Sequence, residues 1–173
     1  QIDMRVGDRA GLVMFDQQVR SILVPNNARS QLGRAAEAMY LLEPDYGESA
    51  YQLAFNAATA RFRRRSLFVV LTDLVEAVVE QALLPALPIL TRRHLVVVAA
   101  VQDPAVAAWA REGSHQWPSE VYRTAAAVGS LDQRARAVAR LRAAGAVVVD
   151  AEPGRLAVEL VDTYLELKAA GRL

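Results

Sequence analysis

The stretch S-L-F-V-V-L-T-D, residues 66–73, decides the fold, because five consecutive apolar residues end abruptly in a threonine and an aspartate. An unbroken apolar run between polar residues is typical of a parallel strand covered by helices on both faces, whereas alternation marks a sheet with one wet face. We therefore expect residues 67–71 to form a buried central strand. Asp73 then lies at its carboxyl end, the edge at which open α/β sheets bind ligands.

Strand-like runs and helical patterns alternate along the rest of the chain. Apolar runs predict further strands at 95–101 and 146–149, and a hairpin of 11–15 with 19–24 at an antiparallel edge. We expect Pro85 and Pro88 to break or kink one helix near Leu84. The fold class that follows is α/β, a mostly parallel sheet flanked by helices. Helical spacing occurs in residues 29–40, 50–61, 76–90, 104–112, 119–144, which we expect to divide at Gly129, and 153–170.

Length and composition are those of a single globular domain spanning residues 1–173. The chain is 53% apolar and 23% charged, which is ordinary for such a domain. Its 20 basic and 19 acidic side chains leave a formal charge of +1, so there is no overall electrostatic reason to expect nucleic acid or an anionic membrane as partner. The longest apolar runs fall far short of the ~20 residues that a membrane helix needs.

The charges are nevertheless sorted along the chain. Aspartates follow the expected strands, whereas arginines precede two of them, so parallel strands would give an acidic carboxyl edge and a basic amino edge. The alternative interpretation is that each aspartate caps the next helix and each arginine is simply solvated. The aspartates are Asp16, Asp73, Asp103 and Asp150, and the arginines are Arg61, Arg63, Arg64 and Arg65 together with Arg92 and Arg93.

Candidate chemistry is sparse. The chain has no cysteine, no G-x-S-x-G motif and no glycine-rich phosphate loop. His94 and His115 lack partners at metal-ligand spacing, and we expect His94 to be exposed at the start of a strand. What remains is a set of hard oxygen ligands for Mg²⁺ or Mn²⁺, namely Asp73 with Ser49 and Glu48. Asp73 and Ser49 also each match a helix capping box, which would explain both without a metal.

Five segments in order resemble the bacterial "domain of unknown function 58" family, which looks like a von Willebrand factor A domain. The segments are G-D-R-A-G-L-V-M-F-D (7–16), L-L-E-P-D-Y-G-E-S (41–49), S-L-F-V-V-L-T-D-L (66–74), R-R-H-L-V-V-V (92–98) and Y-L-E-L-K-A-A-G-R-L (164–173). The resemblance implies a three-layer α/β/α sandwich and a metal-ion-dependent adhesion site. Asp73 matches the carboxylate after the fourth strand of that fold, and Ser49 stands where the family usually has threonine.

The family's D-x-S-x-S motif, which ends its first and central strand, is absent from this chain. By the resemblance, residues 1–173 form a von Willebrand A-like domain that lacks its first strand and most of its first helix, with residues 1–6 as the tail of that helix. We expect this chain alone to hold Mg²⁺ weakly or not at all, and the full-length protein to hold it at a complete site.

The resemblance implies a non-catalytic protein-interaction module that acts with a MoxR-type AAA+ ATPase in the assembly or maturation of other proteins. A cytoplasmic location is expected, with the parent protein attached to the cytoplasmic face of the membrane. One alternative is a metal-dependent phosphotransferase or hydrolase. Such an enzyme would need a second acidic group near Asp73 and a lysine for the phosphoryl group, but the sole lysine, Lys168, lies in the last helix. Another is a structural or oligomerising domain without ligand. A D-x-S-x-S motif upstream of residue 1 would favour the protein-interaction module over both alternatives.

In the resembled fold the absent strand lies between residues 11–15 and 67–71. Uncovering four or five side chains at ~1.5 to 3 kcal/mol each would cost roughly 6 to 15 kcal/mol, comparable with the whole stability of a domain. We therefore expect either direct pairing of residues 12–15 with 68–71, or filling of the slot by another chain, as in a homodimer.

Overall fold

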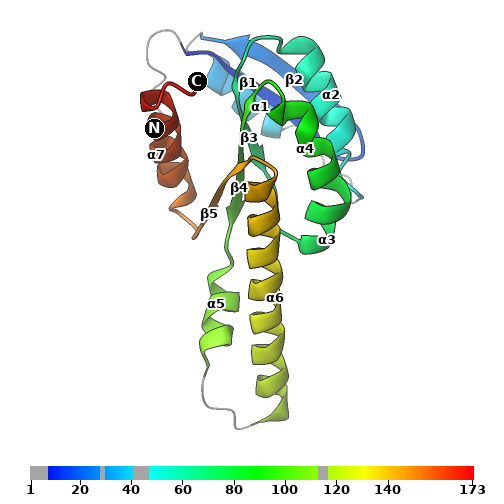
Figure 1. The fold of residues 1–173 in the computed structure, drawn as a ribbon, viewed down its shortest axis with the longest axis vertical. Helices are drawn as coiled ribbons and strands as arrows, with labels where there is room; N and C mark the ends of the chain where they lie inside the picture. The colour runs from blue at the N-terminus through cyan, green and yellow to red at the C-terminus, as the bar shows by residue number, and fades with distance from the viewer. Residues whose placement is uncertain (1–7, 28–29, 41–46, 113–116) are drawn as a thin grey trace.

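The computed structural model describes residues 8–27, 30–40, 47–112 and 117–173, and it confirms a mixed α/β chain with a parallel sheet and an antiparallel strand pair (Figure 1). The expected helix tail at 1–6 and the second histidine, His115, lie outside these residues. The elements are β1 (Ala10–Phe15), β2 (Val19–Asn26), α1 (Gln31–Tyr40), α2 (Tyr51–Arg61), β3 (Leu67–Leu71), α3 (Glu76–Val78), the π-helical turn η1 (Val79–Leu83), α4 (Leu84–Thr91), β4 (Leu95–Val101), α5 (Pro104–Arg111), α6 (Pro118–Ala143), β5 (Val147–Ala151) and α7 (Leu156–Ala169).

The parallel sheet has the order β3-β4-β5, so β4 is its centre. Residues 95–100 of β4 are all buried. The expectation that 67–71 is the buried central strand was wrong, because among the described residues β3 has a strand neighbour on one side only, and of its five residues only Val70 is buried. Val69 is 45% and Leu71 66% exposed. An apolar run indicates that a strand is suited to burial in the core, but it does not show whether other strands pair with it on one side or on both.

Helices cover the sheet on both faces (Figure 1). The larger core lies on the face covered by α2, η1, α4 and α6, where Leu83, Leu87, Leu90 and Leu141 are fully buried. On the opposite face Leu167 of α7 packs on β4 and β5. The β1–β2 hairpin also contributes to the larger core through partly buried side chains such as Phe15.

One helix differs from the sequence expectation. Gly129 does not divide α6, which runs without interruption through Pro118–Ala143. An interior glycine costs a helix only about 1 kcal/mol, and α5 packs alongside α6.

The expected break or kink near Leu84 coincides with a change of helix type. The π-helical turn η1 ends at Leu83, and π-helical turns are a known cause of kinks. The prolines do not end the helical run, which continues as α4 to Thr91. Among the described residues, no helix combines the length and apolarity needed to span a bilayer.

His94 is buried rather than exposed as the sequence suggested. Its residue exposure is 6%, its ring packs edge-on against Phe68 at 4.7 Å between centroids, and its Nδ1 has no hydrogen-bond partner among the described residues. Burial, and secondarily the positive charge of Arg93, lowers the pKa of His94. The imidazole is therefore neutral in the folded chain at neutral pH.

The buried neutral His94 predicts that acid destabilises the fold. Unfolding exposes an imidazole with an ordinary pKa near 6.5, so the unfolded chain binds more protons as the pH falls through that value. The free energy of unfolding should decline from pH 7.5 to 5.5, by at most about 1.4 kcal/mol per pH unit from this group. Urea unfolding of the wild type and of His94→Phe measures the effect. An equal slope in the two proteins would contradict it.

The expected direct pairing of 12–15 with 68–71 was wrong. Within the described residues β1 pairs with β2 and β3 pairs with β4, and the hairpin and the parallel sheet are separate sheets. Phe15 of β1 and Phe68 of β3 nevertheless pack against the same core cluster. No strand of the described residues therefore pairs with the side of β3 away from β4. Filling of this edge by another chain remains a prediction.

We predict that the isolated chain self-associates, because free strand edges invite pairing with another chain. Sedimentation velocity over a concentration series should show a dimer or a larger species. A species that stays monomeric up to high concentration would contradict this prediction.

Candidate functional site

The carboxyl ends of β1 and β3 meet the start of α2, and Tyr51 joins them. The ring of Tyr51 packs edge-on against Phe15 with 5.3 Å between centroids. Its hydroxyl lies 2.5 Å from Oγ1 of Thr72, at hydrogen-bonding distance, just beyond β3. The backbone N–H of Ala50 donates to the carbonyl oxygen of Asp16 at 2.7 Å. A buried aromatic residue with a polar tip can tie two strand ends in this way.

The loop that carries Ser49 lies against the hairpin turn. A Cβ at Gly47 would overlap the side chain of Gln17, so glycine permits the close approach of the two loops. Ser49 is half-buried and lies two residues before Tyr51. Ser49 thus precedes Tyr51 by two residues and Asp73 directly follows Thr72, and the hydroxyls of Tyr51 and Thr72 are in contact.

Asp73 influences the pKa of the Tyr51 hydroxyl. Burial raises the pKa of the Tyr51 hydroxyl, the nearby negative charge of Asp73 raises it further, and the hydrogen bond with Thr72 opposes both. The Tyr51 hydroxyl is thus a neutral group at physiological pH. It contributes a hydrogen bond with Thr72 at the site.

Asp73 and Ser49 do not cap helices, so the capping-box interpretation was wrong for both. The N-cap of α3 is Val75 and that of α2 is Ala50, and neither helix start receives a side-chain hydrogen bond. Asp73 is exposed. In the described part of the chain no hydrogen bond or ion pair holds its carboxylate.

The other three strand-end aspartates have structural partners. Asp16 accepts from the backbone of Gln18 and from Arg20. Asp103 caps α5 by accepting from the backbone N–H of Ala105 at 2.9 Å. Because β3, β4 and β5 are parallel, Asp73, Asp103 and Asp150 lie at one edge of the sheet, as the sequence predicts. Asp150 accepts two bonds from Arg134 Nε and one of 2.6 Å from its Nη2.

The residues present do not complete a magnesium site. Asp73, Ser49 and the exposed Glu48 offer at most three oxygen-bearing side chains. The described residues hold no cluster of three or more acidic or histidine side chains placed to bind a metal. Mg²⁺ requires about six oxygens in near-octahedral geometry and gives up its water reluctantly. These side chains alone do not meet that requirement.

We predict that this chain binds Mg²⁺ weakly or not at all, because a single carboxylate must hold a strongly hydrated ion. Isothermal titration calorimetry of the wild type and of Asp73→Ala should give the same negligible heats. A micromolar affinity for Mg²⁺ that disappears in Asp73→Ala would overturn the prediction.

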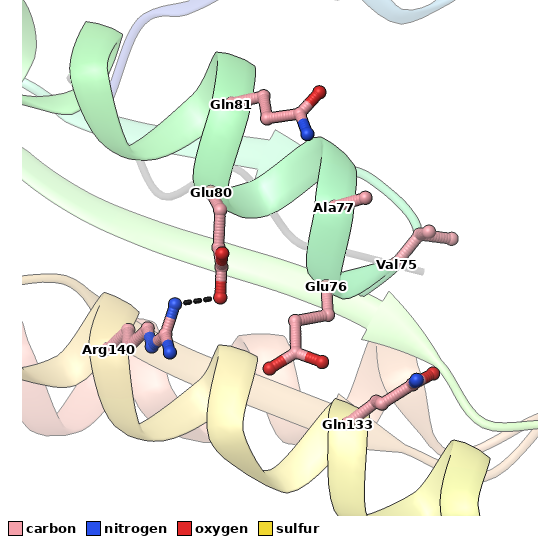
Figure 2. Close-up of a pocket in the computed structure, with 7 residues that line it drawn as sticks. All are labelled: Val75, Glu76, Ala77, Glu80, Gln81, Gln133 and Arg140. Carbon is pink, nitrogen blue, oxygen red and sulfur yellow. Dashed lines mark ion pairs between the residues drawn. The ribbon is translucent and has the colours of Figure 1, made fainter.

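A second polar site, which the sequence analysis missed, lies between α3–η1 and α6 (Figure 2). It is a cavity of about 450 Å³ lined by Glu76, Glu80 and Arg140, among others. Glu80 forms an ion pair with Arg140, and Glu76 accepts from Arg136 Nε at 2.8 Å. The hydrogen bond from Arg136 lowers the pKa of Glu76. Each of the two glutamates of this pocket is therefore paired with an arginine of α6. The sequence did not indicate this pocket, because helical spacing does not show which helices face each other.

The described residues form an α/β sandwich in which Asp73 is the strand-end aspartate without a hydrogen-bond or ion-pair partner for its carboxylate. A family model described as "Protein of unknown function DUF58" matches residues 2–144, and the chain belongs to this family. No curated protein and no solved structure matches the chain.

Proposed function

We propose that the chain is a non-catalytic protein-interaction module whose contact surface is the carboxyl edge of β3. The observation that carries the proposal is the exposed carboxylate of Asp73, which no group of the described chain engages. Its neighbours Asp103 and Asp150 serve as a helix cap and an ion-pair partner. Exposed charged groups without a structural partner are suited to contacts with other molecules.

Catalysis is less well supported by the site. A phosphotransferase needs a second acidic group and a cation for the transferred phosphoryl group beside the strand-end aspartate. The sole lysine, Lys168, is instead held by Asp8 at 2.9 Å and by the hydroxyl of Tyr164 at 3.0 Å. The Tyr51 hydroxyl beside Asp73 is engaged with Thr72 and has a raised pKa. These contacts favour binding over chemistry at this edge.

The partner and the metal follow from the family resemblance. We propose a MoxR-type AAA+ ATPase as the partner, with the pair acting in the assembly or maturation of other proteins at the cytoplasmic face of the membrane. In the full-length protein, metal-ion-dependent adhesion would need oxygen ligands in addition to Asp73 and Ser49. For the present chain we assign the contact to the protein surface around Asp73.

The proposal predicts that Asp73→Asn weakens binding to the MoxR-type ATPase of the same organism by about tenfold or more, equivalent to about 1.4 kcal/mol. Asparagine keeps the shape of the side chain and removes its charge. Asp162→Asn on the exposed side of α7 is the matched control and should bind as the wild type does. Biolayer interferometry with immobilised ATPase measures both. Equal binding by Asp73→Asn and wild type would refute the assignment of the surface.

A further inference from the structure

Helix α6 extends beyond the sheet, and α5 lies alongside the part that projects (Figure 1). The 26 residues of α6 span about 39 Å. Its second half belongs to the body of the domain, because Ala137 and Leu141 are buried in the larger core. We call the projecting part, α5 with residues 118–131 of α6, the arm.

The face of α6 that α3 and η1 cover in the body of the domain continues into the arm. In the second half, Arg136 and Arg140 lie on this face and pair with glutamates of α3 and η1. Residues three and four positions apart extend the same face toward the start of α6. We call its exposed residues in the arm, with those that flank them, the arm face. They are Val121, Tyr122, Ala125, Ala126, Val128 and Gly129.

The arm face is apolar, although the exposed side of a surface helix is normally polar. No residue of α6 between Arg123 and Asp132 carries a charge. Tyr122 is 76% exposed, Val121 49% and Val128 44%. A contiguous exposed apolar surface of this kind indicates a site of contact with another molecule.

Gly129 makes a notch in the arm face. Glycine is unfavourable inside a helix, and this position does not require it, because its φ is not positive and a Cβ there would meet no atom within 4 Å. The described chain therefore gives no structural reason for the glycine. Close approach of a side chain from another molecule would give one. Tyr122, seven residues earlier on the same face, is a side chain large enough to fill such a notch.

The arm face is complementary in shape to a second copy of itself. Let two α6 helices pack antiparallel about a two-fold axis between Ala125 and Ala126. Tyr122 of each copy then lies opposite Gly129 of the other, because the two residues are equally far from the axis. The small alanines at the axis permit close packing of the helices. Self-complementarity of this kind is what a two-fold interface requires.

The charges at the two ends of the arm face are complementary as well. At the tip, where α5 ends and α6 begins, lie the positive end of the α6 dipole and Arg111, which forms no ion pair within the described residues. The glutamates at the tip already accept hydrogen bonds from Arg123 and from the N–H of Trp117. The other end carries the exposed Asp132. In an antiparallel pair, Asp132 of each copy lies beside the positive tip of the other.

The same pairing brings an exposed aromatic ring to the cavity between α3–η1 and α6 (Figure 2). Trp117 directly precedes α6 and is 66% exposed. In the antiparallel pair it lies at the level of Gln133 of the other copy, which lines the cavity together with Val75 and Ala77. An aromatic side chain held in a pocket of the partner is a typical anchor of a protein interface.

We propose that the arm face binds a second copy of this chain, with the two α6 helices antiparallel. Tyr122 of each copy packs against Gly129 of the other, and Trp117 enters the other copy's cavity. This surface is distinct from the Asp73 surface of the proposed function and from the side of β3 away from β4. A helix of a different protein could cover the apolar side chains, but it would not account for the match of Tyr122 with Gly129.

Single introduced cysteines test the pairing, because the chain has no cysteine of its own. Ala125→Cys lies next to the axis and should give a disulfide-linked dimer under mild oxidation. Ala139→Cys, exposed on the same helix outside the arm, should not. Absence of the cross-link at position 125 refutes the proposal.

Nitroxide labels on the same two cysteines test the direction of the pair. Labels at position 125 should lie about 10 Å apart and labels at position 139 about 40 Å apart, measured by electron paramagnetic resonance. A parallel pair would instead bring the labels at position 139 close together and would overturn the antiparallel arrangement.

Substitutions on the arm face separate association from folding. Gly129→Leu should raise the melting temperature of the monomer, because leucine favours a helix and the added side chain has free space. It should also weaken association about tenfold or more by filling the notch. Ala125→Glu should weaken association through like charges at the axis, whereas the matched Ala139→Glu should not. Sedimentation velocity measures association, and wild-type association by Gly129→Leu would refute the role of the notch.

Other occupants of the arm face give different results. Self-association that survives both Ala125→Glu and Gly129→Leu arises from another surface and overturns the proposal. A blue shift of tryptophan fluorescence on phosphatidylcholine vesicles that Tyr122→Ser abolishes, in a chain without the cross-link at position 125, would assign the arm to a lipid surface instead. The cross-link should form equally in Asp73→Asn, so this proposal and the proposed function can fail independently.

Discussion

Burial of β4 on both faces is the constraint on which the rest of the structure depends. Residues 95–100 are covered by α7 on one side and by the larger core on the other, so both backbone edges of β4 must be satisfied by strands. Parallel pairing with β3 and β5 does this. It also fixes the direction of every connection, because each parallel crossover needs a helix to return the chain to the other end of the sheet.

The shared direction of β3, β4 and β5 separates the basic residues from the acidic ones. Chain segments enter β3 and β4 through arginines and leave β3 and β4 through aspartates, so one sheet edge is basic and the other acidic although the whole chain carries a formal charge of +1. At the acidic edge, Asp103 and Asp150 are used within the fold, as a helix cap and as the partner of Arg134. Asp73 and the arginines before β3 are not engaged in this way. Among the described residues, charges without an ion-pair partner thus lie at both ends of the same strand, β3.

Periodicity and strand-end chemistry predicted the strands, their parallel pairing and the common edge of Asp73, Asp103 and Asp150. They could not predict features set by neighbours distant in sequence. The apolar run of β3 resembles that of β4, yet in the described part of the sheet β4 alone has strands on both sides. Polar His94 is buried because Phe68 and the end of α4 surround it, and Gly129 is tolerated because α6 is supported by α5. Tyr51 gave no signal beyond its aromatic character, although it links the hairpin to β3 through its ring and its hydroxyl.

The backbone that leads to Asp73 is held by contacts from both sheets. Asp73 follows Leu71, the last residue of β3, by two positions, and the intervening Thr72 is fixed on one side by its backbone bond to Ala99 and on the other by the Tyr51 hydroxyl. Tyr51 in turn packs against Phe15 of the hairpin. The segment before the exposed carboxylate is therefore positioned by the parallel sheet and by the hairpin together, as a rigid scaffold positions a loop.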